Sequence, residues 1–284
     1  MTKSLTLTAL LIAATAFQVR SEDWPQWGGP NRDSYSKEKG LLQHWPDGGP
    51  KRLWLNNNAG IGYAGVAIAN GQIFTMGGRD GTEHLLALNE KDGKEIWATP
   101  MSPILKNDWG DGPRGTPTVV DGTVYALSGK GLLIAADAKD GKVRWKKELS
   151  ELGGKEQTWG YTESPLVENG TVYIGPGGEK GAVAALDAKT GDVKWQSADF
   201  VDKNLHYSSC VAADINGTRQ IIRLTEKKLA GLDAKTGKLL WQTDFPGSVA
   251  VIPTPIVKGN KIYITAGYNS GSKLVEIDPQ NKAN

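Results

Sequence analysis

A thirteen-residue segment that ends in tryptophan occurs four times in this chain, and its spacing constrains the fold more than any other feature. The copies are LLALNEKDGKEIW ending at Trp97, LIAADAKDGKVRW at Trp145, VAALDAKTGDVKW at Trp195 and LAGLDAKTGKLLW at Trp241. The intervals between these tryptophans are 48, 50 and 46 residues. Repeats of about 40 to 50 residues are typical of β-propellers, in which each repeat forms one four-stranded blade. The chain is therefore predicted to be all-β, with one blade per repeat.

Each repeat also contains a hairpin signature upstream of its tryptophan. Asp121-Gly122, Asn169-Gly170 and Gly259-Asn260 separate short runs in which apolar and polar residues alternate, and such pairs favour the tight turns of β-hairpins. A third strand then leads into an Asn/Asp-to-Gly turn, and the fourth strand carries the tryptophan. Because an indole has a large apolar face, we expect Trp97, Trp145, Trp195 and Trp241 to be structural and to dock against the neighbouring blade.

The number of blades is left open by the sequence. Four repeats are complete, and a fifth supplies three strands before EIDPQNKAN. One interpretation is that KRLWLNN, with Trp54, supplies the missing strand and closes a five-bladed ring. The favoured interpretation is a fragment of a seven- or eight-bladed ring, which would leave an open strand edge in these residues.

The N-terminus has the pattern of a secretory signal peptide. Lys3 precedes an apolar run from Leu5 to Phe17, and Ala14-Thr15-Ala16 or Val19-Arg20-Ser21 offers a cleavage site. We therefore expect a signal peptide at 1–21, an N-terminal arm at 22–50 and the propeller at 51–284, in a periplasmic or secreted protein. The apolar run is shorter than the roughly 20 residues that a membrane span needs, so no transmembrane segment is predicted.

Charge and cysteine content exclude several classes of protein. The net charge is +2 with both signs interspersed, so no basic stripe indicates nucleic-acid binding. Cys210 is the only cysteine; it cannot form an intrachain disulfide, and we interpret it as a buried strand residue.

The segments that enter the innermost strands differ most between repeats, so a ligand site is sought there. NDWGDGPRGTP and QTWGYTESP place aromatic rings beside charges, a combination that could stack a planar ligand and hold it by a charged hydrogen bond. Alternatively, the tryptophans fill gaps between blades and the charges form ion pairs. The candidate ligand-binding residues are Trp109, Asp111, Arg114, Trp159, Tyr161 and Glu163. No catalytic residue and no metal site is assigned.

The pattern AxDxxTGKxxW, most complete before Trp195 and Trp241, resembles the repeat of the pyrroloquinoline quinone (PQQ) type β-propellers. DWPQWGGPNRDS, NDWGDGPRGTPTV and WGYTESPLV resemble segments of exported bacterial proteins of this type. The resemblance implies a tryptophan-docked propeller, distantly like the envelope assembly protein BamB. Because the repeat motif is structural, it does not by itself define an activity.

Two functions follow from the resemblance. The favoured one is a binding or scaffold protein of the cell envelope, whose partner is an envelope protein or a small-molecule or polymer ligand at the propeller mouth. The alternative is a quinoprotein dehydrogenase that oxidises an alcohol or sugar with PQQ and calcium. The paired adjacent cysteines of PQQ alcohol dehydrogenases have no counterpart in a chain with one cysteine. Polymer binding by Trp24, Trp27 and Trp45 is a third hypothesis; packing of the arm along the propeller would explain the same residues.

Overall fold

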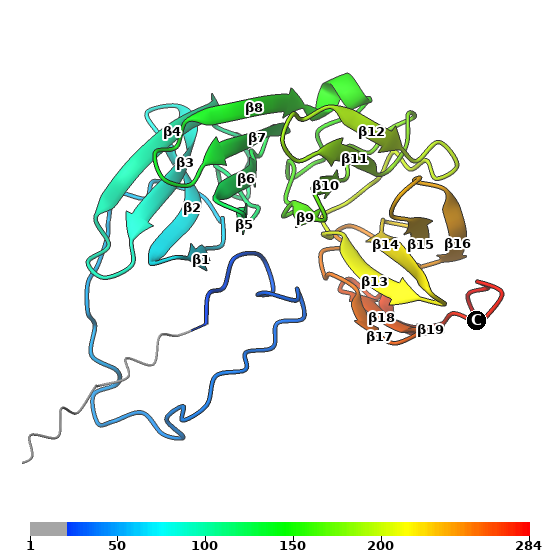
Figure 1. Ribbon diagram of the computed structural model, residues 1–284, viewed down its shortest axis with the longest axis horizontal. Helices are drawn as coiled ribbons and strands as arrows, with labels where there is room; N and C mark the ends of the chain where they lie inside the picture. Colours follow the sequence, from blue (N-terminus) through cyan, green and yellow to red (C-terminus); the bar gives the residue numbers. More distant parts are fainter. Residues whose placement is uncertain (1–21) are drawn as a thin grey trace, which may run out of the picture.

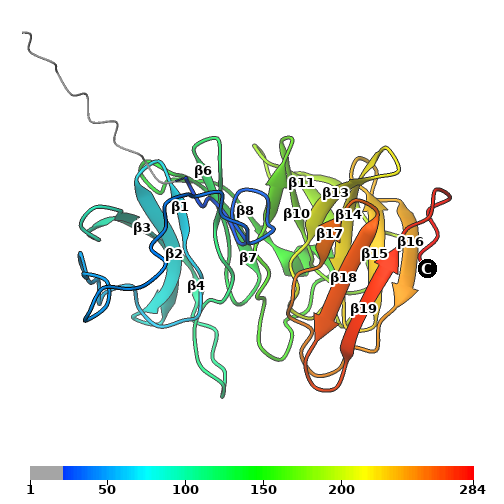
Figure 2. The same ribbon diagram turned by 90° about the horizontal axis from the view of Figure 1, so that it is seen from below.

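A computed structural model describes residues 22–284, so the predicted signal peptide at 1–21 lies outside the described residues. The described part contains nineteen strands and one short 3-10 helix, Leu149–Leu152. The strands form antiparallel sheets that stand side by side around an arc (Figure 1). Seen from below, the same sheets face one another in succession (Figure 2). This arrangement confirms the predicted all-β propeller.

Four sheets have four strands each, and the fifth has three. The first sheet contains β1 (Ala67–Ala69), β2 (Gln72–Arg79), β3 (Thr82–Asn89) and β4 (Glu95–Pro103). The second contains β5 (Thr118–Val120), β6 (Thr123–Leu127), β7 (Leu132–Asp137) and β8 (Val143–Glu148). The third contains β9 (Leu166–Glu168), β10 (Thr171–Ile174), β11 (Ala184–Asp187) and β12 (Val193–Gln196). The fourth contains β13 (Val211–Ile215), β14 (Thr218–Leu224), β15 (Lys228–Asp233) and β16 (Leu239–Asp244), and the fifth β17 (Ile256–Lys258), β18 (Lys261–Ala266) and β19 (Gly271–Glu276).

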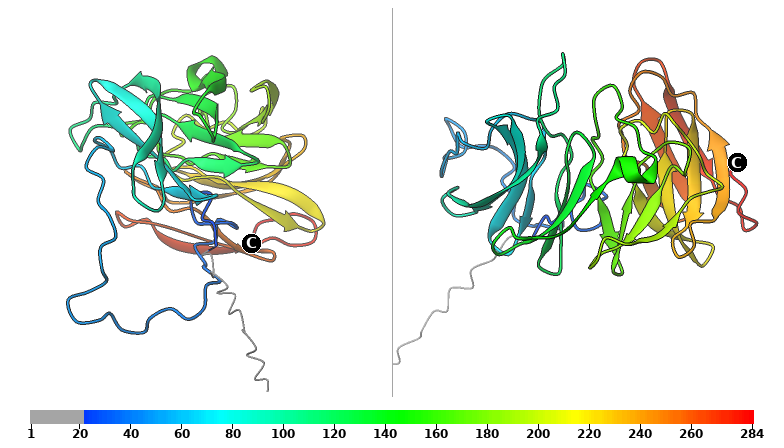
Figure 3. Two further views of the ribbon diagram at one scale, coloured as in Figure 1. Left: turned by 60° about the vertical axis from the view of Figure 1, so that its left-hand side comes forward. Right: turned by 90° about the horizontal axis from the view of Figure 1, so that it is seen from above.

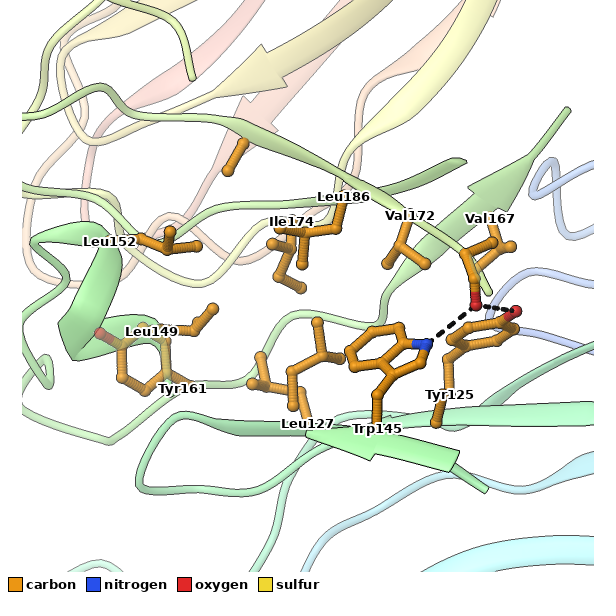
Figure 4. Close-up of a cluster of buried hydrophobic side chains, with 14 residues drawn as sticks. Tyr125, Leu127, Trp145, Leu149, Leu152, Tyr161, Val167, Val172, Ile174 and Leu186 are labelled. Atoms are coloured by element: carbon orange, nitrogen blue, oxygen red, sulfur yellow. Dashed lines mark hydrogen bonds between the residues drawn. The ribbon is translucent and has the colours of Figure 1, made fainter. Parts of the chain in front are cut away.

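Contacts between successive sheets repeat with the sequence. The indole N–H groups of Trp97, Trp145 and Trp195 donate to backbone oxygens of Ala138, Ala188 and Ala234, at 2.9–3.1 Å, each in the turn of the next sheet. The phenol of Tyr125 donates to the same Ala188 oxygen at 3.1 Å, so two bonds converge on one carbonyl (Figure 4). These bonds fix the angle between neighbouring sheets, while aliphatic side chains fill the space beside them.

The glycine of each turn makes room for the docked indole. Gly191 has φ 76°, and a β-carbon there would lie 2.7 Å from the ring of Trp145. Gly141 and Gly237 stand in the same relation to Trp97 and Trp195. Two constraints favour glycine at this position. The backbone is in the left-handed region, and the indole occupies the space that a β-carbon would need.

The fourth tryptophan departs from this scheme. Trp241 donates its indole N–H to Oε1 of Gln220 in its own sheet, at 2.7 Å. Its strand partner is Gly231, where a β-carbon would lie 2.3 Å from the indole. The turn of the fifth sheet is DPQNK, in which Asn281, with φ 60°, occupies the left-handed position that glycine takes in the other turns. The fourth and fifth sheets are instead joined mainly by aliphatic packing.

The segment around Trp54 docks on the first sheet in the same way that Trp97, Trp145 and Trp195 each dock on the sheet that follows their own. The Trp54 indole donates to the Glu90 oxygen at 2.9 Å, and the Asn56 side-chain amide donates to the Gly93 oxygen at 2.7 Å. This segment forms no strand pair with β19 within residues 22–284. The closed five-bladed ring considered from the sequence is therefore not formed, and the open arc is consistent with part of a larger ring.

The N-terminal arm, residues 22–50, lies partly inside the arc (Figure 1). Trp24 and Ile68 of β1 exchange two backbone hydrogen bonds of 2.9 and 2.8 Å, and Val119 N–H donates to the Pro25 oxygen at 2.8 Å. Arg32, which is 8% exposed, donates to the backbone oxygens of Ser164 and Pro165. The arm therefore connects the inner edges of three sheets, while its later part runs away from the body (Figure 3).

Candidate functional site: the rim

The segments that precede the innermost strands form a continuous rim. We define the rim as residues 59–66, 104–117, 153–165, 197–210 and 245–255. Neighbouring segments are joined in turn by Tyr63 N–H to Pro113 O (2.8 Å), Asn107 Nδ2 to Thr158 O (2.7 Å), Thr162 Oγ1 to Tyr207 O (2.9 Å) and Tyr207 N–H to Val251 O (3.0 Å). The rim is thus a hydrogen-bonded surface rather than a set of independent loops.

Trp109 is the most exposed aromatic residue of the rim, with 76% of its surface accessible. Its backbone is nevertheless fixed at both polar groups. Its N–H donates to Oδ1 of Asn107 at 3.0 Å, and its carbonyl accepts from the Tyr63 hydroxyl at 3.1 Å. An exposed indole on a constrained backbone loses little backbone entropy when it binds a partner.

Asp111 and Arg114 hold the same loop in place. Asp111 lies 2.7 Å from the Lys106 ammonium and accepts the Asn107 N–H at 3.0 Å. The hydrogen bond from Lys106 is the main cause that holds the pKa of Asp111 below its usual value. Arg114 lies over the Tyr63 ring, 5.2 Å from its centroid, and donates to the Gly110 oxygen at 2.7 Å.

Trp159 begins a second aromatic group on the next rim segment. Its ring is tilted by 57° against Tyr207 at 5.3 Å, and Tyr207 stacks on His206 at 5.3 Å and 19°. Nδ1 of His206 accepts the Val251 N–H at 3.3 Å, and burial lowers the pKa of the imidazole. Because Nδ1 accepts this hydrogen bond, it carries no proton in the folded protein.

The last two candidates point into the protein. Tyr161 is 6% exposed, packs in the core between the second and third sheets, and donates to the Pro176 oxygen at 3.4 Å. Glu163 is 3% exposed; it pairs with Arg223 at 2.7 Å and accepts N–H groups from Gly175 and Cys210. The structure thus brings Trp109, Asp111 and Arg114 together on the rim and places Glu163 between sheets.

The sequence did not identify three further residues of the rim as candidates. They are Tyr63, His206 and Tyr207. Aligning IGYAGV before the first sheet with the other entry segments would have indicated Tyr63. Tyr207 lies in LHYSSC, the segment that precedes the fourth sheet, and its contact with Trp159 joins residues 48 positions apart. That pairing depends on the stacking of the third and fourth sheets.

The candidate residues do not fit a PQQ and calcium site. Glu163 already has a cation and two N–H donors, and Trp159 already packs on Tyr207. Within residues 22–284, no group of three or more His, Cys, Asp or Glu side chains is placed to hold a metal ion. Burial raises the pKa of Cys210 to about 12, which makes its thiol a poor nucleophile. No step through PQQ is derived from these residues.

The sheets, the docked tryptophans and the rim define a β-propeller of the tryptophan-docking type. A family model described as outer membrane protein assembly factor BamB matches residues 81–284, and the chain belongs to this family. No curated protein sequence matches the chain significantly. No helix among the described residues is long and apolar enough to span a membrane.

Solved structures of two kinds share the fold. BamB from Moraxella catarrhalis is 19% identical, with a TM-score of 0.54 over 81% of this chain and 63% of that one. The quinohemoprotein alcohol dehydrogenase ADHIIG from Pseudomonas putida HK5 is 19% identical, with a TM-score of 0.55 over 90% and 45%. The corresponding enzyme from Comamonas testosteroni is 19% identical, with a TM-score of 0.56 over 90% and 46%. This chain thus spans less than two thirds of each, and the likeness concerns the fold alone.

Proposed function

We propose that this protein is a binding or assembly protein of the cell envelope that presents its rim to a protein partner. The observation that carries the proposal is Trp109, which is 76% exposed on a loop fixed by Tyr63, Asn107 and Arg114. Tryptophan, tyrosine and arginine are the residues that most often dominate binding energy at protein interfaces. Membership of the BamB family supports an assembly role, and the signal-peptide pattern at 1–21 supports export to the periplasm or beyond.

Site-specific photo-cross-linking tests this proposal. The photoreactive amino acid p-benzoylphenylalanine replaces Trp109 in one variant and Lys139, an exposed turn residue of the second sheet, in a matched control. After irradiation of cells, the variant at position 109 is expected to give a discrete protein adduct that the control lacks. The same adducts from both positions, or none from position 109, would contradict a rim interface.

The same variants test localisation. Cell fractionation is expected to place the mature chain in the periplasm or the medium, without residues 1–21. Retention of the full-length chain in the cytoplasm would contradict the envelope role, whatever the cross-linking result.

The second candidate function, a PQQ-dependent alcohol or sugar dehydrogenase, draws on the fold shared with the two quinohemoprotein enzymes. Titration calorimetry of the mature chain with PQQ, with and without calcium, tests it directly. Stoichiometric, calcium-dependent binding would favour the dehydrogenase and would require a site other than the one formed by Glu163. The rim proposal expects no such binding.

A further inference from the structure

A groove of about 550 Å³ separates the N-terminal arm from the innermost strands of the fourth and fifth sheets. Trp27, Asn31 and Asp33 line the arm side, and Val211–Asp214 of β13 and Pro253–Val257 line the other. A volume in this range is typical of ligand sites. The groove shares Pro253, Thr254 and Pro255 with the rim, but Trp109 is not among its lining residues.

The arm itself shows how an extended segment binds to an inner strand. Trp24 and Ile68 of β1 exchange both backbone hydrogen bonds, which is an isolated antiparallel bridge. Pro25 then accepts the N–H of Val119 in β5. The inner edges of the first two sheets are therefore already paired with an added chain.

The inner edges of the fourth and fifth sheets are not paired in this way. In the described part of the chain, β13 pairs only with β14 and β17 only with β18. No backbone hydrogen bond from outside its sheet reaches β13 among residues 22–284. An unpaired strand edge is a template for another extended chain, and β13 presents four of its five residues, Val211–Asp214, along the groove.

The lining indicates which side chains such a segment would carry. Trp27 is 46% exposed and donates its N–H to Thr254 Oγ1 at 3.1 Å, and Ile256 is 62% exposed. The carboxylates of Asp33 and Asp214 add negative charge to this surface, and Asp214 shares Arg219 with Glu168. Arg32 also lines the groove, but it is 8% exposed and its guanidinium already donates to Ser164 and Pro165. Aliphatic and basic side chains complement such a lining.

We propose that this groove binds an extended peptide segment that pairs with the free edge of β13 and carries alternating aliphatic and basic side chains. Main-chain hydrogen bonds supply affinity in this mode of recognition, and pockets for alternate side chains supply selectivity. The proposal does not depend on Trp109: the groove can bind a peptide whether or not Trp109 contacts a partner.

A labelled pentapeptide, Val-Lys-Val-Lys-Val, tests the proposal with the whole mature protein. Fluorescence anisotropy is expected to show saturable binding, and hydrogen exchange to show protection of residues 211–215. The same peptide N-methylated at every residue is expected to bind about tenfold more weakly or worse, because it cannot donate backbone hydrogen bonds. Equal binding of the two peptides, protection elsewhere, or no binding would overturn the proposal.

Variants of the lining separate the groove from other surfaces. Asp33→Asn with Asp214→Asn is expected to weaken binding about three- to tenfold at low salt. Asp140→Asn, on an exposed turn of the second sheet, is the matched control and is expected to bind normally. Trp109→Ala is expected to keep peptide binding, because Trp109 does not line the groove. The cross-link from position 109 and the peptide titration are separate readouts, so failure of one proposal is distinguishable from failure of the other. Displacement of the peptide by chitohexaose without β13 protection would indicate a sugar site and overturn the peptide assignment.

Discussion

Oε1 of Glu163 lies 2.7 Å from Nη1 of Arg223, and both side chains are buried between the third and fourth sheets. The other carboxylate oxygen accepts the Gly175 N–H at 2.8 Å, so Glu163 connects residues from two repeats. This pair assigns Glu163 to the joint between sheets, as in the ion-pair alternative considered from the sequence. The ligand hypothesis for the rim then rests on Trp109, Asp111 and Arg114.

Glu163→Gln is expected to destabilise the fold by about 3 kcal/mol or more, because it leaves the buried charge of Arg223 unpaired. Urea unfolding measures the change, and Asp140→Asn controls for the loss of a carboxylate at the surface. Adding Arg223→Met to Glu163→Gln is expected to recover part of the stability. A change below about 1 kcal/mol in the single variant would show that the pair is not important for stability.

Gly191→Ala tests the room that the turn provides for Trp145. Gly170→Ala is the matched control, since both glycines have positive φ (76° and 67°) but only Gly191 faces an indole at 2.7 Å. The control is expected to cost about 1 kcal/mol from backbone strain. Gly191→Ala is expected to cost about 1–3 kcal/mol more, from overpacking. Equal melting temperatures for the two variants would contradict this role of the turn glycine.

His206 is expected to make stability depend on pH. Burial is the main cause that lowers its pKa in the folded state below the ordinary histidine value of 6.5. The contribution is therefore fully present above pH 6.5 and is lost as the pH falls through the folded pKa, because the unfolded chain takes up the proton first. His206→Asn, which tolerates the positive φ of 55° at this position, is expected to remove this dependence.

Urea unfolding of wild type and His206→Asn at about pH 7.5, 6 and 5 measures the effect. The difference in free energy of unfolding between the two proteins is expected to shrink as the pH falls. A constant difference across this range would show that another group causes the acid sensitivity.

Arg32→Met is expected to loosen the arm from the inner edges. Burial lowers the pKa of Arg32 to about 10, so the guanidinium is still charged at neutral pH when it donates to Ser164 and Pro165. Loss of these bonds is expected to speed amide exchange of Ile68 and Val119 about tenfold or more. Lys37→Met, an exposed change in the same arm, is the control, and equal exchange in the two variants would contradict the anchoring role of Arg32.

Local features of the sequence predicted the sheets well. The Asn-Gly and Asp-Gly pairs, the Asp-to-Gly turns and the tryptophan period each act within one repeat, and the strands of the first four sheets follow them. The sequence also indicated the exceptions. Asn281 replaces the turn glycine in the fifth sheet, and Gly231 stands where Ala87, Ala135 and Ala185 face the other tryptophans.

The sequence by itself thus determined the repeat, the strand order within each sheet and the residues able to dock on the next one, because hydrophobic alternation and turn chemistry are local. Tertiary structure alone decided that Glu163 faces Arg223, that Trp109 faces solvent and that the arm enters the arc. These outcomes depend on contacts between residues far apart in the sequence, such as Glu163 and Arg223, which are 60 positions apart, or on the space left between sheets. A buried charge needs a partner of opposite charge, and that partner is brought close only when the sheets pack together. A local sequence pattern does not indicate which distant residue it is.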